Sequence, residues 1–181
     1  MTNYRRNFVA GGGYFFTVNL ADRRLRLLIE KIGLLRAAIP YTQARHPFAI
    51  EAIVVLPDHL HAVWTLPESD EDFAVRWRLI KSTFSHALPA TERISPSRMR
   101  KGERGVWQRR YWEHTIRDGE DFARHVDYIH FNLVNHRHVS RAKDWPYSSF
   151  RRMVRLGVYP EDWGGDVRDD GNRFGELLRE R

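Results

Sequence analysis

Compact apolar runs alternate along the chain with segments of helical periodicity. β-branched and aromatic residues dominate the runs, and glycine, proline or polar residues bound them, which is typical of strands. Three clear runs occupy residues 14–20, 48–56 and 61–66, and two short candidates occupy residues 106–108 and 114–116. The pattern therefore predicts three strands and two further short ones.

Apolar residues that recur at every third or fourth position predict three helices. The first follows Asp22, which is placed to cap it, and is expected to end at Pro40. The others span residues 70–88 and 118–135. This order of elements predicts an α+β fold: a ferredoxin-like antiparallel sheet with helices packed mainly on one face.

The length of 181 residues fits one domain with a real core and a small appendage. We expect a domain over residues 1–150 and a C-terminal tail over residues 151–181. No apolar run approaches the roughly 20 residues of a membrane helix, and no leader-like segment opens the chain. Cysteine is absent, so disulfides and thiolate metal sites are excluded. A cytoplasmic protein is the expectation.

The net charge of +7 and the pI near 10 favour a polyanionic partner, for which nucleic acid is a better fit than a membrane surface. The charge is uneven, because residues 161–181 are net acidic. This acidic part of the tail could fold over a basic groove and compete with DNA, or it could be an ordinary disordered terminus.

His59 and His61 carry the candidate chemistry, because alternate residues of a strand share one face. Two imidazoles suit Mn²⁺, Zn²⁺, Co²⁺ or, less typically, Mg²⁺. About seventy residues downstream, Tyr128 and Asn132 stand four apart on a predicted helix and also share a face. A second pair, His136 and His138, follows the end of that helix and is interpreted as a helix-end or DNA-facing group.

Six ordered blocks of the chain resemble the REP-associated tyrosine transposases, a branch of the HUH (His-hydrophobe-His) single-strand transposases. The resemblance covers most of residues 4–150. The blocks are Tyr4-Arg5-Arg6, Gly11 to Thr17, Leu56 to His61, Val106 to His114, Tyr128 to Asn132, and Trp145 to Ser149. The family usually has proline where this chain has Leu133, so we expect the helix to run slightly longer here.

The resemblance implies a role for each candidate residue. His59 and His61 match the metal pair, Asn132 the third metal-ligand position, and Tyr128 the nucleophile. A divalent ion, Mg²⁺ or Mn²⁺, would be the cofactor. The implied activity is that of a bacterial, nucleoid-associated endonuclease and strand transferase. It would act on single-stranded DNA that contains a hairpin, through a 5′-phosphotyrosine intermediate, as a monomer or a homodimer.

Basic residues near aromatic ones provide candidate DNA contacts, because cations track phosphates while aromatic rings stack on bases. The candidates are Arg5, Arg6, Arg98, Arg100, Lys101, Arg104, Arg109 and Arg110. Alternatively, Trp107 and Trp112 are core residues and the arginines only solvate a loop. Two other functions remain open: a non-catalytic nucleic-acid-binding module on a ferredoxin-like sheet, and a metal-dependent hydrolase with water as nucleophile.

Overall fold

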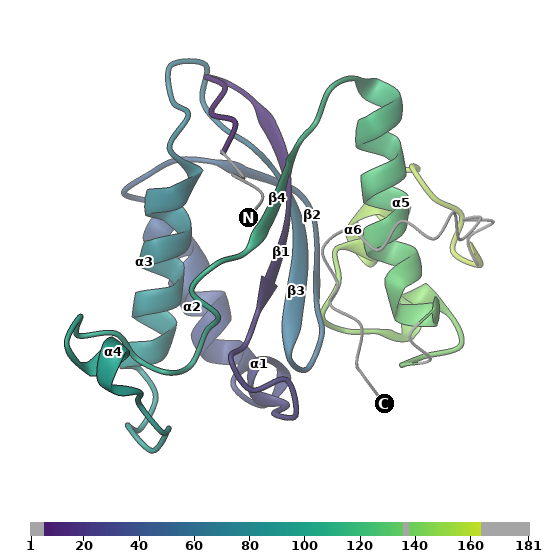
Figure 1. Ribbon diagram of the computed structural model, residues 1–181. Helices are drawn as coiled ribbons and strands as arrows, with labels where there is room; N and C mark the ends of the chain where they lie inside the picture. Colours follow the sequence, from purple (N-terminus) through teal and green to yellow (C-terminus); the bar gives the residue numbers. More distant parts are fainter. Residues whose placement is uncertain (1–5, 136–137, 164–181) are drawn as a thin grey trace, which may run out of the picture.

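A four-stranded antiparallel sheet forms the centre of the molecule (Figure 1). The computed structural model describes residues 6–135 and 138–163. The strands are β1 (Gly13–Asn19), β2 (Ala49–Val55), β3 (His59–Thr65) and β4 (Trp112–Thr115). They lie in the order β2-β3-β1-β4, with β1 and β3 in the middle. The predicted α+β antiparallel fold is confirmed.

Helices cover both faces of this sheet, which corrects the expectation that they pack mainly on one. The helices are α1 (Leu27–Glu30), α2 (Ile32–Gln43), α3 (Phe73–His86), α4 (Pro96–Met99), α5 (Gly119–Asn135) and α6 (Phe150–Arg155), with a 3₁₀ turn η1 (Ala142–Asp144). Figure 1 shows α2 and α3 on one side of the sheet and α5 with α6 on the other. The physical reason is that the central strands bury apolar side chains on both faces.

Alternation along β1 shows how the two cores divide. Tyr14 and Phe16 point into the core under α2 and α3, where Phe16 also lies 5.4 Å from the ring of Trp77. Phe15 points the other way, into the core under Val126 and Ile129 of α5. All three aromatic side chains are fully buried. The sheet is therefore the middle layer of three, and each face has its own hydrophobic core.

Three predicted element boundaries are wrong. Asp22 accepts a hydrogen bond from the backbone of Arg24 instead of capping a helix, and α1 begins only at Leu27. Pro40 lies inside α2, because a proline forfeits only its own N–H bond while its carbonyl still accepts from Ala44 at 2.9 Å. The segment 106–108 forms a single bridge between Leu20 and Trp107 in place of a strand.

The segment after η1 docks on the edge of the sheet. Ser149 donates its backbone N–H to Ile53 at 2.8 Å, and the Trp145 indole donates to Val55 at 2.9 Å. Beyond it, the rings of Phe150, Tyr159 and Trp163 stack on one another. Residues 151–163 thus pack on the face that carries α5, whereas the rest of the acidic tail lies outside the described residues. No helix within the described ranges is long and apolar enough to cross a membrane.

Candidate active site and nucleic-acid surface

His59 and His61 open β3 directly after the turn at Pro57 and Asp58. Because they alternate on the strand, both imidazoles point to the face that α5 covers, and their ring centres lie 5.0 Å apart. His61 is fully buried and His59 nearly so. The strand thus presents two imidazoles side by side at one end of the sheet.

The helix α5 brings Tyr128 and Asn132 to the same place. Asp118 accepts from the backbone N–H of Asp121 at 2.8 Å and so caps its first turn. The ring of Tyr128 meets that of His61 edge-on at 5.4 Å, and Nδ2 of Asn132 lies 3.5 Å from Nε2 of His61. Asn132 is buried, whereas Tyr128 is half-buried. The four predicted site residues therefore lie together.

Two neighbours orient the imidazoles. The hydroxyl Oγ1 of Thr17, across the β1–β3 ladder, lies 2.9 Å from Nδ1 of His61. A carboxylate oxygen of Asp58 lies 2.8 Å from Nδ1 of His59. Because an ionised carboxylate only accepts, His59 must carry its proton on Nδ1, which leaves the Nε2 lone pair for a metal. A Thr17 hydroxyl that accepts from His61 sets the same tautomer there.

Asp58 is held ionised by its surroundings. Burial raises the pKa of this carboxyl, but the hydrogen bond from His59 and the ion pair with Arg23 outweigh that effect. Nε of Arg23 donates to the other carboxylate oxygen at 2.5 Å. The net result is a pKa for Asp58 well below its usual value. The charge that fixes the tautomer of His59 is therefore present at neutral pH.

This donor set fits a divalent ion. His59 and His61 offer two imidazole nitrogens, and the amide of Asn132 could add an oxygen, because amide oxygen and nitrogen exchange places without a change of shape. Hydrogen-bonded partners of the kind supplied by Asp58 and Thr17 are typical of metal-binding imidazoles. Protein ligands from two elements would leave positions for a phosphate oxygen.

A second cluster, formed by His114, Asp121 and His125, also has the spacing of metal ligands. It fits an ion poorly, because Arg117 and Arg124 both donate to the Asp121 carboxylate. That carboxylate also lies 2.7 Å from Nε2 of His114. Burial raises the pKa of Asp121, but the bonds from His114 and the two arginines bring it well below its usual value. The cluster therefore ties α5 to β4 as a hydrogen-bonded network.

The sequence prediction did not identify this network. Its signal was available, because Asp121 and His125 stand four apart on the predicted helix and so share a face. The ring of His125 lies 4.9 Å from Phe15, whose ring in turn lies 5.9 Å from that of Tyr128. The network thus supports the side of α5 that carries the tyrosine.

The predicted DNA-binding arginines differ in how much of their guanidinium is already used. All five N–H donors of Arg104 bond within the protein, to Glu92 and to the carbonyls of Ser85, Leu88 and Pro89. Arg98 donates to two backbone carbonyls. The structure therefore assigns Arg104 to holding its loop against the end of α3.

The other predicted DNA contacts lie closer to solvent. Arg100, Lys101 and Arg110 are exposed. Arg109, also exposed, pairs with Glu103 at 2.6 Å. Arg6 lies 4.4 Å from the ring centre of Tyr111 and 3.4 Å from Glu113. Arg5 lies outside the described residues.

The aromatic residues of this region divide in the same way. Trp107 belongs to the core under α3, where its ring lies 5.3 Å from that of Phe84, so the core interpretation holds for it. Trp112 is half-buried and packs edge-on against Phe15. Of the second histidine pair, His136 lies outside the described residues, and His138 is exposed beside the ring of Trp145.

Comparisons with known proteins point to one family. No family model matches the chain. A REP-associated tyrosine transposase of Escherichia coli (strain K12) is 48% identical over 169 residues, which cover 93% of this chain and 94% of that protein. A protein of the same family name from Haemophilus influenzae is 48% identical over 167 residues, covering 92% of this chain and 95% of that protein.

A solved structure of a REP-associated tyrosine transposase bound to a REP hairpin superposes with a TM-score of 0.85. It is 47% identical and covers 98% of this chain and 99% of its own. The identity is thus close to one half over almost the whole length of each protein. The chain belongs to the REP-associated tyrosine transposase family.

Proposed function

We propose that this chain is a metal-dependent endonuclease and strand transferase acting on single-stranded DNA that carries a hairpin. The observation that carries the proposal is the meeting of Tyr128 and Asn132 of α5 with His59 and His61 of β3. A tyrosine beside a candidate metal pair is a phosphodiester-cleaving arrangement. The relative of known structure that was bound to a REP hairpin supports this class of DNA substrate.

The nucleophile in this proposal is the phenolic oxygen of Tyr128. It attacks the scissile phosphorus, the bond from phosphorus to the 3′ oxygen breaks, and the leaving strand takes up a proton as a 3′-hydroxyl. The 5′ phosphate remains on the tyrosine as a phosphodiester. Attack by a second 3′-hydroxyl reverses the step and joins the strands. The phosphotyrosine bond conserves the energy of the cleaved phosphodiester, so no nucleoside triphosphate is needed.

Tyr128 needs activation, because a tyrosine of ordinary pKa, about 10, is almost entirely protonated at neutral pH. His59, His61 and Asn132 would hold a divalent ion such as Mg²⁺ or Mn²⁺. When bound, the ion would polarise the phosphate and neutralise the charge that develops on its oxygens. Thr17 and Asp58 keep the two Nε2 lone pairs available for it.

Three exposed cations offer the substrate a track. Arg100, Lys101 and Arg110 are open to solvent, and they lie in the segment that connects α3 with β4. Cations of this kind bind the phosphate backbone irrespective of sequence. The supported role for these residues is therefore to position DNA rather than to read its bases.

The test is formation of a covalent adduct. The protein is incubated with 5′- and 3′-labelled hairpin DNA and Mn²⁺ or Mg²⁺, and a denaturing gel separates adduct from free strand. We expect an adduct with the native protein, none with Tyr128→Phe, and an unchanged amount with the matched control Tyr41→Phe, since Tyr41 is an exposed residue of α2.

The other outcomes separate the rival functions. Cleavage that persists in Tyr128→Phe without adduct means that water is the nucleophile and contradicts the proposal. Binding without any cleavage by the native protein points to a non-catalytic module. Mixing Tyr128→Phe with His61→Ala tests the assembly, because restored activity requires a dimer that combines residues from two chains.

A further inference from the structure

Asn19 ends β1 next to the candidate metal pair, and it pairs with His59 across the β1–β3 ladder. Its neighbours Val18 and Leu20 both point into the core under α2 and α3. Because side chains alternate along a strand, the side chain of Asn19 points to the opposite face. Both candidate metal-binding imidazoles lie on that face, which α5 covers. Asn19 therefore stands beside His59 on the metal side of the sheet.

The amide oxygen of Asn19 is buried without a hydrogen-bond donor. Only 4% of the residue is exposed, and no group within residues 6–135 and 138–163 donates to the enclosed Oδ1. Buried polar atoms are nearly always hydrogen-bonded, because an unpaired one loses its bonds to water without replacing them. Asparagine is also disfavoured in strands. A partner that comes from outside the chain accounts for an asparagine at this position.

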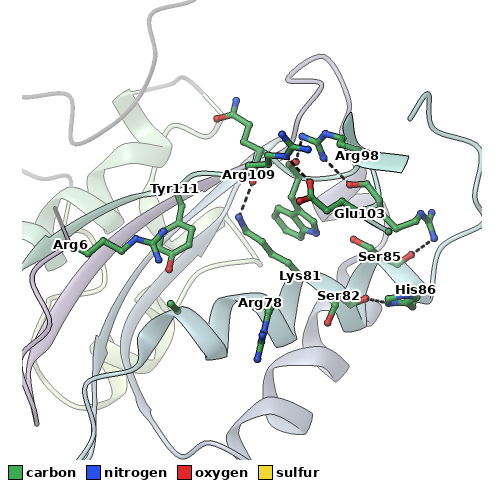
Figure 2. A pocket seen from close by; sticks show the side chains of 15 residues that line it. Arg6, Arg78, Lys81, Ser82, Ser85, His86, Arg98, Glu103, Arg109 and Tyr111 are labelled. Atoms are coloured by element: carbon green, nitrogen blue, oxygen red, sulfur yellow. Dashed lines mark hydrogen bonds and ion pairs between the residues drawn. The ribbon is translucent and has the colours of Figure 1, made fainter. Parts of the chain in front are cut away.

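The backbone of Asn19 is held on several sides, so its amide has a fixed position. Gln108 donates its N–H to the carbonyl oxygen of Asn19 at 3.0 Å. Gln108 is in turn held from α3, because Nζ of Lys81 donates to its carbonyl oxygen at 3.0 Å (Figure 2). The next residue, Leu20, donates its N–H to the carbonyl oxygen of Asp58 at 2.8 Å. A binding group on rigid elements is preorganised for its ligand.

An amide oxygen is a suitable ligand for a hard divalent ion. Carbonyl and carboxylate oxygens suit Mg²⁺ and Mn²⁺, and a neutral amide binds them without first losing a proton. His59, His61 and Asn132 are the three protein donors already identified, and they come from two elements. An octahedral ion has room for a fourth protein donor as well as for oxygens of the substrate.

We propose that Asn19 is a fourth protein ligand of the divalent ion, through its amide oxygen Oδ1. The inference rests on the proposed function and deepens it, since it adds a donor to the metal site of that proposal. With Asn19 the donors come from β1, β3 and α5, so a bound ion joins the two central strands to the helix that carries Tyr128. Loss of the Asn19 oxygen should therefore weaken metal binding and leave the fold intact.

The experiment measures binding of Mn²⁺ alone to the full chain, by isothermal titration calorimetry without DNA. Asn19→Leu nearly keeps the size of the side chain and removes its oxygen. We expect the Mn²⁺ affinity to fall about tenfold. The melting temperature of the metal-free protein should stay the same or rise by up to about 4 °C, because an unpaired buried oxygen is removed. The matched control Asn7→Leu, at an exposed asparagine, should change neither quantity.

Asn19→Asp is the second variant, because it keeps the shape and offers the ion a charged oxygen. Its Mn²⁺ affinity should exceed that of the native protein about tenfold, whereas its metal-free form should melt at a lower temperature because a charge is buried. His61→Ala should abolish the binding and so identifies the site that is measured.

Two results would overturn the inference. Mn²⁺ affinities of Asn19→Leu and Asn19→Asp within about twofold of the native value would show that Oδ1 does not bind the ion, and that a buried water is its partner. A fall in both the Mn²⁺ affinity and the melting temperature of Asn19→Leu would show that Asn19 supports the fold instead.

The adduct assay, run in parallel, separates this inference from the proposed function. Native protein that binds Mn²⁺ through Asn19 but forms no adduct contradicts only the catalytic proposal. A normal adduct, together with native Mn²⁺ affinity in Asn19→Leu, contradicts only the assignment of Asn19. Mn²⁺ binding that survives in His61→Ala lies elsewhere on the protein and contradicts both.

Discussion

Thr17 and His61 face each other across the β1–β3 ladder, with Oγ1 of the threonine 2.9 Å from Nδ1 of the imidazole. The pair links the centre of the sheet to the candidate metal site, because the strand register alone places the hydroxyl at that nitrogen. The other nitrogen of His61 faces the amide of Asn132. One imidazole thus joins the sheet to α5.

Replacement of this hydroxyl should weaken metal binding without removing a ligand. In Thr17→Val the shape is nearly kept, but Nδ1 of His61 loses the partner that sets its tautomer. Loss of such a partner typically reduces metal affinity or activity about 10- to 100-fold. The measurement is adduct yield against Mn²⁺ concentration: the midpoint should rise, and Thr17→Ser should restore it. A midpoint unchanged in Thr17→Val would show that the hydroxyl does not orient the ligand.

Asp58→Asn should produce a similar loss at the other histidine. An amide can donate to Nδ1 of His59, which favours the tautomer with its proton on Nε2, the nitrogen needed for the ion. We expect the Mn²⁺ midpoint to rise about 10- to 100-fold. Asp22→Asn is the matched control, because Asp22 is paired with Arg24 near the same turn but does not contact a histidine. Equal midpoints for the two variants would contradict the assignment.

The sequence predicted the sheet and the two pairs of site residues, because alternation in a strand and the helical repeat act locally. That the two pairs share one site was implied by the resemblance to the family. The sequence did not predict which face of the sheet α5 covers, because the apolar side of a helix can pack against either apolar face of a sheet. A usable signal lay in Tyr14, Phe15 and Phe16. Three successive aromatic residues of one strand cannot all bury on one side, and they require cover on both.

The roles of individual arginines could not be predicted either. Arg100 and Arg104 lie in one polar segment and have the same side chain. Arg100 is exposed, whereas every N–H of the Arg104 guanidinium donates to another group of the protein. That difference depends on carbonyls of the last turn of α3 and the residues after it, which become neighbours only when the chain has folded. The sequence shows that both residues are cations, but it does not show which groups they bind.

Arg104→Ala should therefore lower stability, whereas Arg100→Ala should lower only DNA affinity. Removal of the Arg104 side chain takes away both hydrogen bonds to the Glu92 carboxylate and one donor each from the carbonyls of Ser85 and Leu88. Hydrogen bonds to a charged group contribute about 1.5–3 kcal/mol, so we expect the free energy of unfolding to fall by about 2–3 kcal/mol. For Arg100→Ala, an exposed position, the change should stay within about 0.5 kcal/mol. Urea titration monitored by tryptophan fluorescence measures both, and equal midpoints would refute the structural role of Arg104.

The stability of the protein should depend on pH through Lys81. Burial, and then the nearby charges of Arg6 and Arg98, lower the pKa of its ammonium group to about 7. The unfolded chain holds the same proton more tightly, because there the lysine has its ordinary value of 10.5.

The free energy of unfolding should therefore rise as the pH increases from about 7 towards 10.5, because the unfolded chain binds the lysine proton across this range and the folded protein does not. Urea titrations at pH 7 and pH 9 provide the measurement. The native protein should gain stability between the two, whereas Lys81→Met should lose this gain, because methionine has no proton to bind. The control Lys31→Met, at an exposed lysine between α1 and α2, should behave as the native protein does. An equal gain in the native protein and in Lys81→Met would assign the pH dependence to another group.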